Sequence, residues 1–85
     1  MQNKIRVKDH NKFRLFDYLN EPNSLVKLGE VVTYNSEPNK LGVIIQTFGD
    51  GDFRTDMCGN TCIDEITFST LEEIKNNRPE LLNHL

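Results

Sequence analysis

The sequence predicts a mainly β fold: a small antiparallel barrel of four to five strands, with a basic N-terminal arm and a short C-terminal helical segment. Four segments rich in β-branched and aromatic residues follow residue 28, with turn residues about every 8–12 positions. The chain has no Ala, the best helix former, so it lacks the usual material of a helical bundle. Its 85 residues are enough for one domain with a thin core.

The basic arm is assigned to residues 1–27 because charge is unevenly placed along the chain. Residues 1–28 hold six basic and three acidic groups, a net charge of +3, whereas residues 29–85 hold four and ten, a net charge of −6. The turn signal PNS at residues 22–24 marks the boundary. A basic arm therefore precedes an acidic body, residues 28–85, which comprises the barrel and its helical cap.

The beginning of the arm has little material for a core. After Met1, residues 1–9 hold only two large apolar residues, Ile5 and Val7, and no turn or cap signal. Chain ends with few apolar contacts are usually poorly ordered. We therefore expect residues 1–9 to be mobile and dispensable for folding.

The motif FRLFDYL, residues 13–19, has two interpretations. Phe13, Phe16 and Leu19 at spacing three favour a short amphipathic helix. Phe13 and Leu15 alternating with charged neighbours would instead indicate a strand. We expect the helix.

Four strands are expected in the body. The second is apolar on both faces from Val43 to Ile45, as a central strand covered on both sides should be. Turns are expected at residues 36–40 (SEPNK), at residues 50–51 (DG), where a tight hairpin needs positive φ, and at residues 59–60 (GN). The strands are GEVVTYN (29–35), LGVIIQTF (41–48), DFRTDM (52–57) and TCIDEITF (61–68).

A turn at residues 59–60 would pair the third strand with the fourth as a hairpin. Arg54 would then lie opposite Glu65, a charge pair worth about 0.2–1 kcal/mol. Two apolar pairs would enter the core: Phe53 with Ile66, and Met57 with Cys62.

The C-terminal segment carries helix signals. Ser69 or Thr70 can cap a helix, with Glu72 or Glu73 at the capping-box spacing and an apolar side formed by Leu71 and Ile74. Pro79 suits the first position of a further helical turn. Three leucines of that turn are expected to cover an open end of the sheet: Leu81, Leu82 and Leu85.

KLGEVVTYN (27–35) followed by LGVIIQTFGDGDFRTDMCGN (41–60) resembles the small Src-homology-3-like barrels, which include KOW-type and Tudor-type domains. The shared pattern is a Gly-led first strand, a second strand opening Gly-Val-Ile, a turn, and a short third strand ending in Gly. The resemblance covers about residues 28–68 and implies the barrel fold. It implies no activity, because many unrelated functions share this fold. The acidic body and the few basic or aromatic loop residues depart from the nucleic-acid-binding members.

Neither metal binding nor catalysis is predicted. Asp50-x-Asp52 resembles the start of a calcium loop, but the pattern fails at its fifth, sixth and twelfth positions. Cys58-x3-Cys62 supplies two thiols, whereas structural zinc needs four ligands, and both histidines lie near the chain ends. We expect the cysteines to be reduced and buried as small hydrophobes. We expect no cofactor and no catalytic residue, so the protein is not predicted to be an enzyme.

The candidate binding site combines an acidic rim with aromatic residues. The rim consists of Asp50, Asp52, Asp56 and Asp64, whose like charges repel one another and do not help folding. A basic protein or peptide would relieve that repulsion. Arg54 could orient the partner, although charge can also simply keep an edge strand soluble. The predicted function is a non-enzymatic interaction module that binds a protein or peptide through the barrel loops, with these site residues: Tyr34, Phe48, Asp50, Asp52, Arg54 and Asp56.

Nucleic acid is the alternative partner. The arm places a cation at nearly every second residue, and such a stretch could follow a phosphate backbone. The acidic body would repel the same phosphates, so the arm could instead lie against the body itself. The arm residues concerned are Lys4, Arg6, Lys8, His10, Lys12 and Arg14.

The sequence favours a cytoplasmic protein. Its first ten residues lack the apolar run of a signal peptide, and no stretch approaches the roughly 20 apolar residues that span a bilayer. We therefore expect no membrane partner. Abundant Asn, Lys and Ile without Ala fits A/T-rich codons, which favours a bacterial or phage origin.

Overall fold

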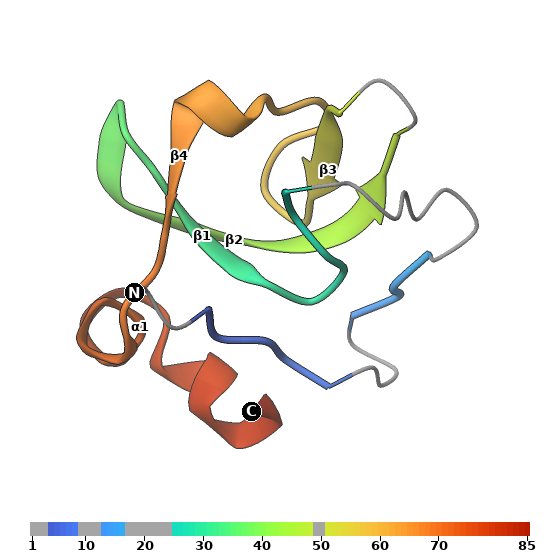
Figure 1. Ribbon diagram of the computed structural model, residues 1–85. Coiled ribbons are helices and arrows are strands. Elements are labelled where there is room, and N and C mark those ends of the chain that lie inside the picture. Colours follow the sequence, from blue (N-terminus) through green and yellow to red (C-terminus); the bar gives the residue numbers. More distant parts are fainter. Residues whose placement is uncertain (1–3, 9–12, 17–24, 49–50) are drawn as a thin grey trace.

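The computed structural model describes residues 4–8, 13–16, 25–48 and 51–85 (Figure 1). This part of the chain is mainly β, an open sheet of four antiparallel strands in the order β3-β2-β1-β4, followed by a short helix. The predicted fold class is confirmed at that level. The elements are β1 (Val31–Tyr34), β2 (Glu37–Thr47), β3 (Phe53–Thr55), the 3₁₀ helix η1 (Ile63–Glu65), β4 (Ile66–Phe68), α1 (Leu71–Asn77) and the 3₁₀ helix η2 (Pro79–His84).

The two central strands form as expected, with a shorter turn between them. All four residues of β1 are buried, and Val43 and Ile44 of β2 are fully buried. The predicted turn over residues 36–40 is wrong for residues 37–40, which belong to β2. Three of these four residues are exposed, and an exposed strand end tolerates Pro.

The sheet separates two apolar clusters. Successive strand residues point to opposite faces, so Val31 and Val43 enter one cluster while Val32 and Ile44 enter the other. The first cluster also contains residues from the arm and the C-terminal turns: Val7, Phe13, Ile74 and Leu81. Burial on both faces explains the continuous apolar run of β2.

The expected hairpin between the third and fourth strands is wrong. Phe53 exchanges main-chain hydrogen bonds with Thr61, at 3.0 and 2.8 Å, and β4 pairs with β1 instead of β3. The cause is η1, where the Cys62 N–H donates to Glu65 Oε2 at 2.8 Å and closes a helical turn. The chain leaves β3 there, so none of the proposed cross-strand partners of Arg54, Phe53 and Met57 is formed.

The expectation that the start of the arm makes few contacts is wrong for residues 4–8. Val7 is only 5% exposed, its N–H donates to Gly29 O at 2.8 Å, and Val31 N–H donates to Ile5 O at 2.9 Å. Gly29 permits this approach because its φ is +87° and a Cβ there would lie 2.8 Å from Val7 O. The arm segment runs between the start of β1 and η2 (Figure 1), where Lys8 N–H donates to His84 O.

The helix expected in FRLFDYL is wrong for residues 13–16. These residues form no strand either, although Phe13 and Leu15 pack against the core while Arg14 is exposed, the alternation on which the strand interpretation depended. Phe16 forms a parallel bridge with Gln46, and its N–H donates to Ile45 O at 2.8 Å. Phe13 is 2% exposed, whereas Arg14 is exposed. The pairing to β2 satisfies main-chain groups that a helix would have satisfied internally. Residues 17–19 of the motif lie outside the described residues.

The C-terminal helical segment begins at the predicted cap. Thr70 and Glu73 form the capping box, with Glu73 N–H donating to Thr70 Oγ1 at 3.1 Å and Thr70 N–H to Glu73 Oε1 at 2.8 Å. Pro79 opens η2 as expected. Of the three leucines expected to cover the sheet, only Leu81 is buried, while Leu82 and Leu85 are each 37% exposed.

Candidate binding site

A surface cavity of about 340 Å³ lies between the arm and the sheet. Its lining residues come from three places: the arm segment 13–16, the end of β2, and the residue that follows β3. They are Phe13, Arg14, Phe16, Ile45 and Asp56. Among these described residues three are apolar and two carry opposite charges, so this part of the lining combines an apolar surface with a few polar groups, as binding pockets usually do.

Main-chain hydrogen bonds hold the arm wall of the cavity. Leu15 N–H donates to Phe13 O at 2.9 Å, a tight turn centred on Arg14, and Phe16 N–H donates to Ile45 O. The Phe13 ring meets the His84 ring edge to face, with centroids 5.3 Å apart. Phe13 is thereby buried, whereas the Phe16 ring remains 42% exposed at the cavity. The backbone therefore presents an aromatic ring and a guanidinium to solvent from one short, fixed segment.

The opposite wall is held by an ion pair. Asp56 Oδ1 accepts the main-chain N–H of Val43 at 2.8 Å, and Arg78 NH1 lies 2.9 Å from Asp56 Oδ2. The same guanidinium nitrogen donates to Leu41 O at 3.2 Å, while Arg78 Nε donates to Glu80 Oε2 at 2.9 Å. These contacts satisfy main-chain groups of β2, so Asp56 and Arg78 fix that strand to the C-terminal turns.

Ionic partners keep Arg78 charged despite its burial. Burial alone lowers the Arg78 pKa, but hydrogen bonds to Glu80 and Asp56 outweigh it, and the net effect raises the pKa above its usual value. The Asp56 carboxylate therefore faces a permanent cation. This corrects the expectation that Asp56 belongs to a free acidic rim, because its carboxylate is paired with Arg78, a cation that it shares with Glu80.

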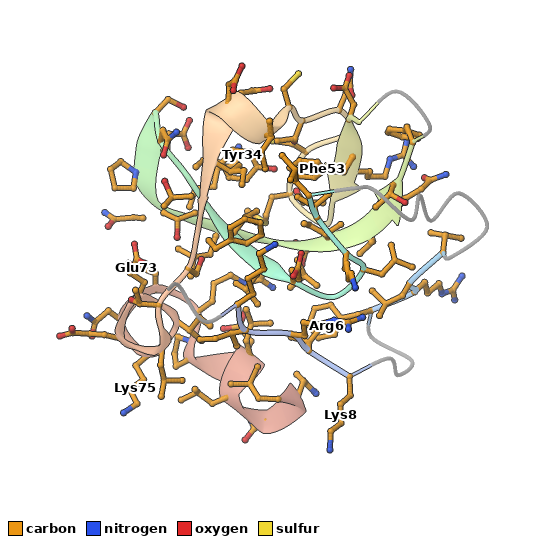
Figure 2. All side chains as sticks on the ribbon, in the orientation of Figure 1. Arg6, Lys8, Tyr34, Phe53, Glu73 and Lys75 are labelled. Carbon is orange, nitrogen blue, oxygen red and sulfur yellow. The ribbon has the colours of Figure 1, made fainter. Side chains whose placement is uncertain are left out.

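Tyr34 lies in the core and does not serve as a surface contact. Its hydroxyl lies 2.6 Å from Thr55 Oγ1 and 3.1 Å from Thr61 Oγ1, and burial raises its pKa. Figure 2 shows Tyr34 and Phe53 pointing into the space between the strands. The proposed role of Tyr34 as an aromatic contact is wrong because the ring is needed for packing and the hydroxyl for the two buried threonines.

The other predicted site residues lie near the β2–β3 turn. Phe48 and Asp52 are half-buried and joined by a hydrogen bond from Phe48 N–H to Asp52 O at 2.9 Å. Arg54 is exposed, and its Nε lies 3.5 Å from Gly59 O, so the expected pair with Glu65 is absent. Asp50 lies outside the described residues. Asp52 directly precedes β3 and Asp56 directly follows it.

The two thiols differ from the expected buried pair. Both cysteines are free, Cys58 is half-buried and Cys62 is exposed. A hydrogen bond from Cys62 to Asp52 is the main cause that raises the Cys62 pKa to about 11. Cys62 begins η1, which turns its side chain away from the core position it would hold in a hairpin. Within the described ranges, no group of three His, Cys, Asp or Glu residues could hold a metal ion.

Two arm cations are used inside the fold. Lys4 Nζ donates to Leu25 O at 2.8 Å and lies 3.9 Å from Glu30 Oε2, and Arg6 Nε and NH2 donate to Leu28 O at 3.1 and 2.9 Å. Lys8 points away from the molecule (Figure 2), and Arg14 is exposed. His10 and Lys12 lie outside the described residues. In this part of the chain, the arm lies against its own body, which was the alternative to a nucleic-acid role.

The sequence did not indicate Phe13, Phe16 and Ile45 as site residues, and it indicated Arg14 only as a nucleic-acid contact of the arm. The alternation of Phe13 and Leu15 with charged neighbours was the available signal, but it could not show that the segment would line a cavity with β2.

Among the described residues, no helix has the length and apolar character needed to cross a membrane. No family model, no curated protein and no solved structure matches the chain. The resemblance to Src-homology-3-like barrels therefore stays a prediction.

Proposed function

We propose that this protein is a non-enzymatic interaction module that binds a protein or peptide at the cavity beside Phe16. The observation that carries the proposal is the Phe16 ring, 42% exposed on a cavity wall that main-chain hydrogen bonds hold in place. Fully burying an exposed large apolar side chain is worth about 1.5–3 kcal/mol, so covering the exposed part of Phe16 is worth about 0.6–1.3 kcal/mol. A partner that covers this ring gains that contribution without first having to order the wall.

The chemistry of the lining supports binding over catalysis. The cavity is lined by none of the usual nucleophiles or bases, Ser, Thr, Cys, Lys or His, among the described residues. Asp56, the carboxylate among the described lining residues, is held by Arg78 and Val43 N–H. A volume of about 340 Å³ is at the lower end of the range for ligand pockets, about 300–1,000 Å³, which suits side chains of a peptide.

The architecture that we propose for the module is the small Src-homology-3-like barrel. Isolated bridges of Arg6 with Glu30 and of Phe16 with Gln46 extend the pairing beyond the four strands. A further bridge joins Phe53 to Thr61. These bridges support a sheet that continues into the arm. We also propose a cytoplasmic location, which would keep both free thiols reduced.

Peptide selection with NMR mapping tests the proposal. Random heptapeptides are selected against the full chain, and binding is mapped by amide shifts. We expect the shifts to concentrate on residues 13–16, Ile45 and Asp56. Phe16→Ser should weaken binding about threefold or more, while Met57→Ser, a change at a residue that is 48% exposed and does not line the cavity, should not.

The proposal fails if no peptide moves these amides, or if Phe16→Ser binds as tightly as the native chain. Retention on heparin at low salt that depends on the arm cations and not on Phe16 would favour the nucleic-acid alternative instead.

A further inference from the structure

The two charged residues of the cavity are not equivalent. Asp56 has a cation and a main-chain donor already in place, Arg78 at 2.9 Å and Val43 N–H at 2.8 Å. Arg14 has no ion pair with any residue that the structure describes. The charge that the cavity offers to a partner is therefore the guanidinium of Arg14.

The backbone on both sides of Arg14 is fixed. The Leu15 N–H donates to Phe13 O across Arg14, and the next residue, Phe16, is bonded to Ile45 O. Phe13 is buried and also lines the cavity, whereas Arg14 and Phe16 are exposed and line it beside Phe13. A guanidinium on a fixed backbone loses less conformational entropy when it binds than one on a mobile loop.

We infer that the partner is an acidic peptide segment, in which an apolar side chain covers Phe16 and Ile45 and a neighbouring carboxylate binds Arg14. A planar guanidinium matches a carboxylate with two parallel hydrogen bonds. A basic side chain would meet the charge of Arg14 and would find Asp56 already paired with Arg78, so charge complementarity at Arg14 favours an acid. The inference rests on the proposed function, since it names the partner chemistry of the same cavity.

The inference reverses the charge expected for the partner. The acidic rim predicted a basic partner, but Asp56 is occupied by Arg78, and Asp52 lies at the other end of β3. Residues 1–28 carry a net charge of +3 and residues 29–85 one of −6, so the arm side of the cavity, where Arg14 lies, would attract an acidic segment and the body would repel it.

Heptapeptide arrays test the inference. The central position is fixed as Glu, Gln or Lys, the flanks sample all residues, and the fluorescently labelled full chain is the probe. We expect the Glu-centred peptides with an apolar neighbour to bind best, and their Gln versions to bind about tenfold more weakly. Arg14→Gln should remove the difference between Glu and Gln, while Arg14→Glu should favour the Lys-centred peptides.

Arg54→Gln is the matched control, because it removes another exposed arginine that does not line the cavity. Melting midpoints within about 2 °C of the native chain show that each variant folds. If peptides bind through Phe16 but Glu and Gln versions bind equally, the carboxylate inference is overturned and the proposed function stands. If no array member binds, both are overturned. If Arg14 is needed only for retention on heparin or DNA, the site recognises phosphate and the inference is wrong.

Discussion

Replacing Asp56 with Ala removes the group that joins the turn after β3 to β2 and to the C-terminal turns. The carboxylate accepts the Val43 N–H at 2.8 Å and pairs with Arg78 at 2.9 Å. Arg78 would keep its bonds to Leu41 O and Glu80, so it would not be left alone. Val43 is fully buried, so its N–H would lose its side-chain acceptor where water has little access.

The expected loss of stability can be worked from these contacts. A buried donor left without an acceptor costs about 1–3 kcal/mol. The ion pair is partly screened, because the Asp56 and Arg78 side chains are 24% and 15% exposed, and we assign it about 1 kcal/mol. The sum is about 2–4 kcal/mol, which corresponds to a decrease of about 10–25 °C in the melting midpoint for a domain of this size.

Asp56→Asn separates the two contributions. The amide oxygen can still accept the Val43 N–H, but the charge is lost, so we expect a loss of only about 1 kcal/mol. Asp64→Ala is the control for removing an exposed carboxylate, and it should change stability by no more than about 0.5 kcal/mol. Urea unfolding followed by circular dichroism measures all three variants, and a double-mutant cycle of Asp56→Asn with Arg78→Gln measures the coupling.

The reasoning is refuted if Asp56→Ala and Asp56→Asn lose the same stability, since the Val43 N–H would then not depend on Asp56. It is also refuted if Asp56→Ala behaves like Asp64→Ala. A coupling energy near zero in the cycle would show that the Asp56–Arg78 pair contributes nothing and that only the main-chain hydrogen bond matters.

Three further predictions concern the arm, the glycines and a thiol. Deleting residues 1–7 should lower the melting midpoint by about 10 °C or more, because Val7 and its main-chain bonds leave the core; an unchanged midpoint would contradict the packing of the arm. Gly29→Ala should cost more stability than Gly51→Ala in urea unfolding, since both have positive φ but only Gly29 would place a Cβ 2.8 Å from a carbonyl oxygen. Equal losses would refute the close approach. Cys62 should react slowly with iodoacetamide at pH 8 despite its exposure, because a pKa of about 11 keeps the thiol protonated, and the rate should rise as pH approaches 11. Peptide mapping by mass spectrometry identifies the thiol, and fast alkylation at pH 8 would contradict the raised pKa.

Local sequence signals predicted the elements that depend on neighbouring residues. The capping box at Thr70 and Glu73, the proline that opens η2 and the glycine in the β2–β3 turn all depend on contacts within a few positions. The apolar run in β2 also predicted a strand covered on both sides. These features are readable because the residues that determine them lie close together in sequence.

The sequence did not show which strands and side chains would pair when they lie far apart along the chain. The fourth strand has the composition of a hairpin partner for β3, yet the turn closed by Cys62 and Glu65 directs it to β1. A Cys replaces the Ser or Thr of a usual capping box, so the sequence did not indicate that a helical turn would begin there. In the arm, the charges of Lys4 and Arg6 masked the alternation of Ile5 and Val7, which is the pattern of an edge strand. The hydrogen bond from Arg78 to Leu41 O of β2 joins residues far apart in sequence, so no local sequence pattern predicted it.

One short segment links the core to the proposed site. Phe13 belongs to the first apolar cluster and also lines the cavity, beside Arg14 and Phe16. Within the tight turn centred on Arg14, Phe13 and Leu15 pack against the core while Arg14 is exposed. Turning Arg14 inward would bury a guanidinium without an ionic partner, so the packing of Phe13 and Leu15 fixes the position of the site. Residues 4–8 and 13–16 of the arm are thus part of the described domain, and the charge boundary at residue 27 separates neither its core nor its candidate binding surface.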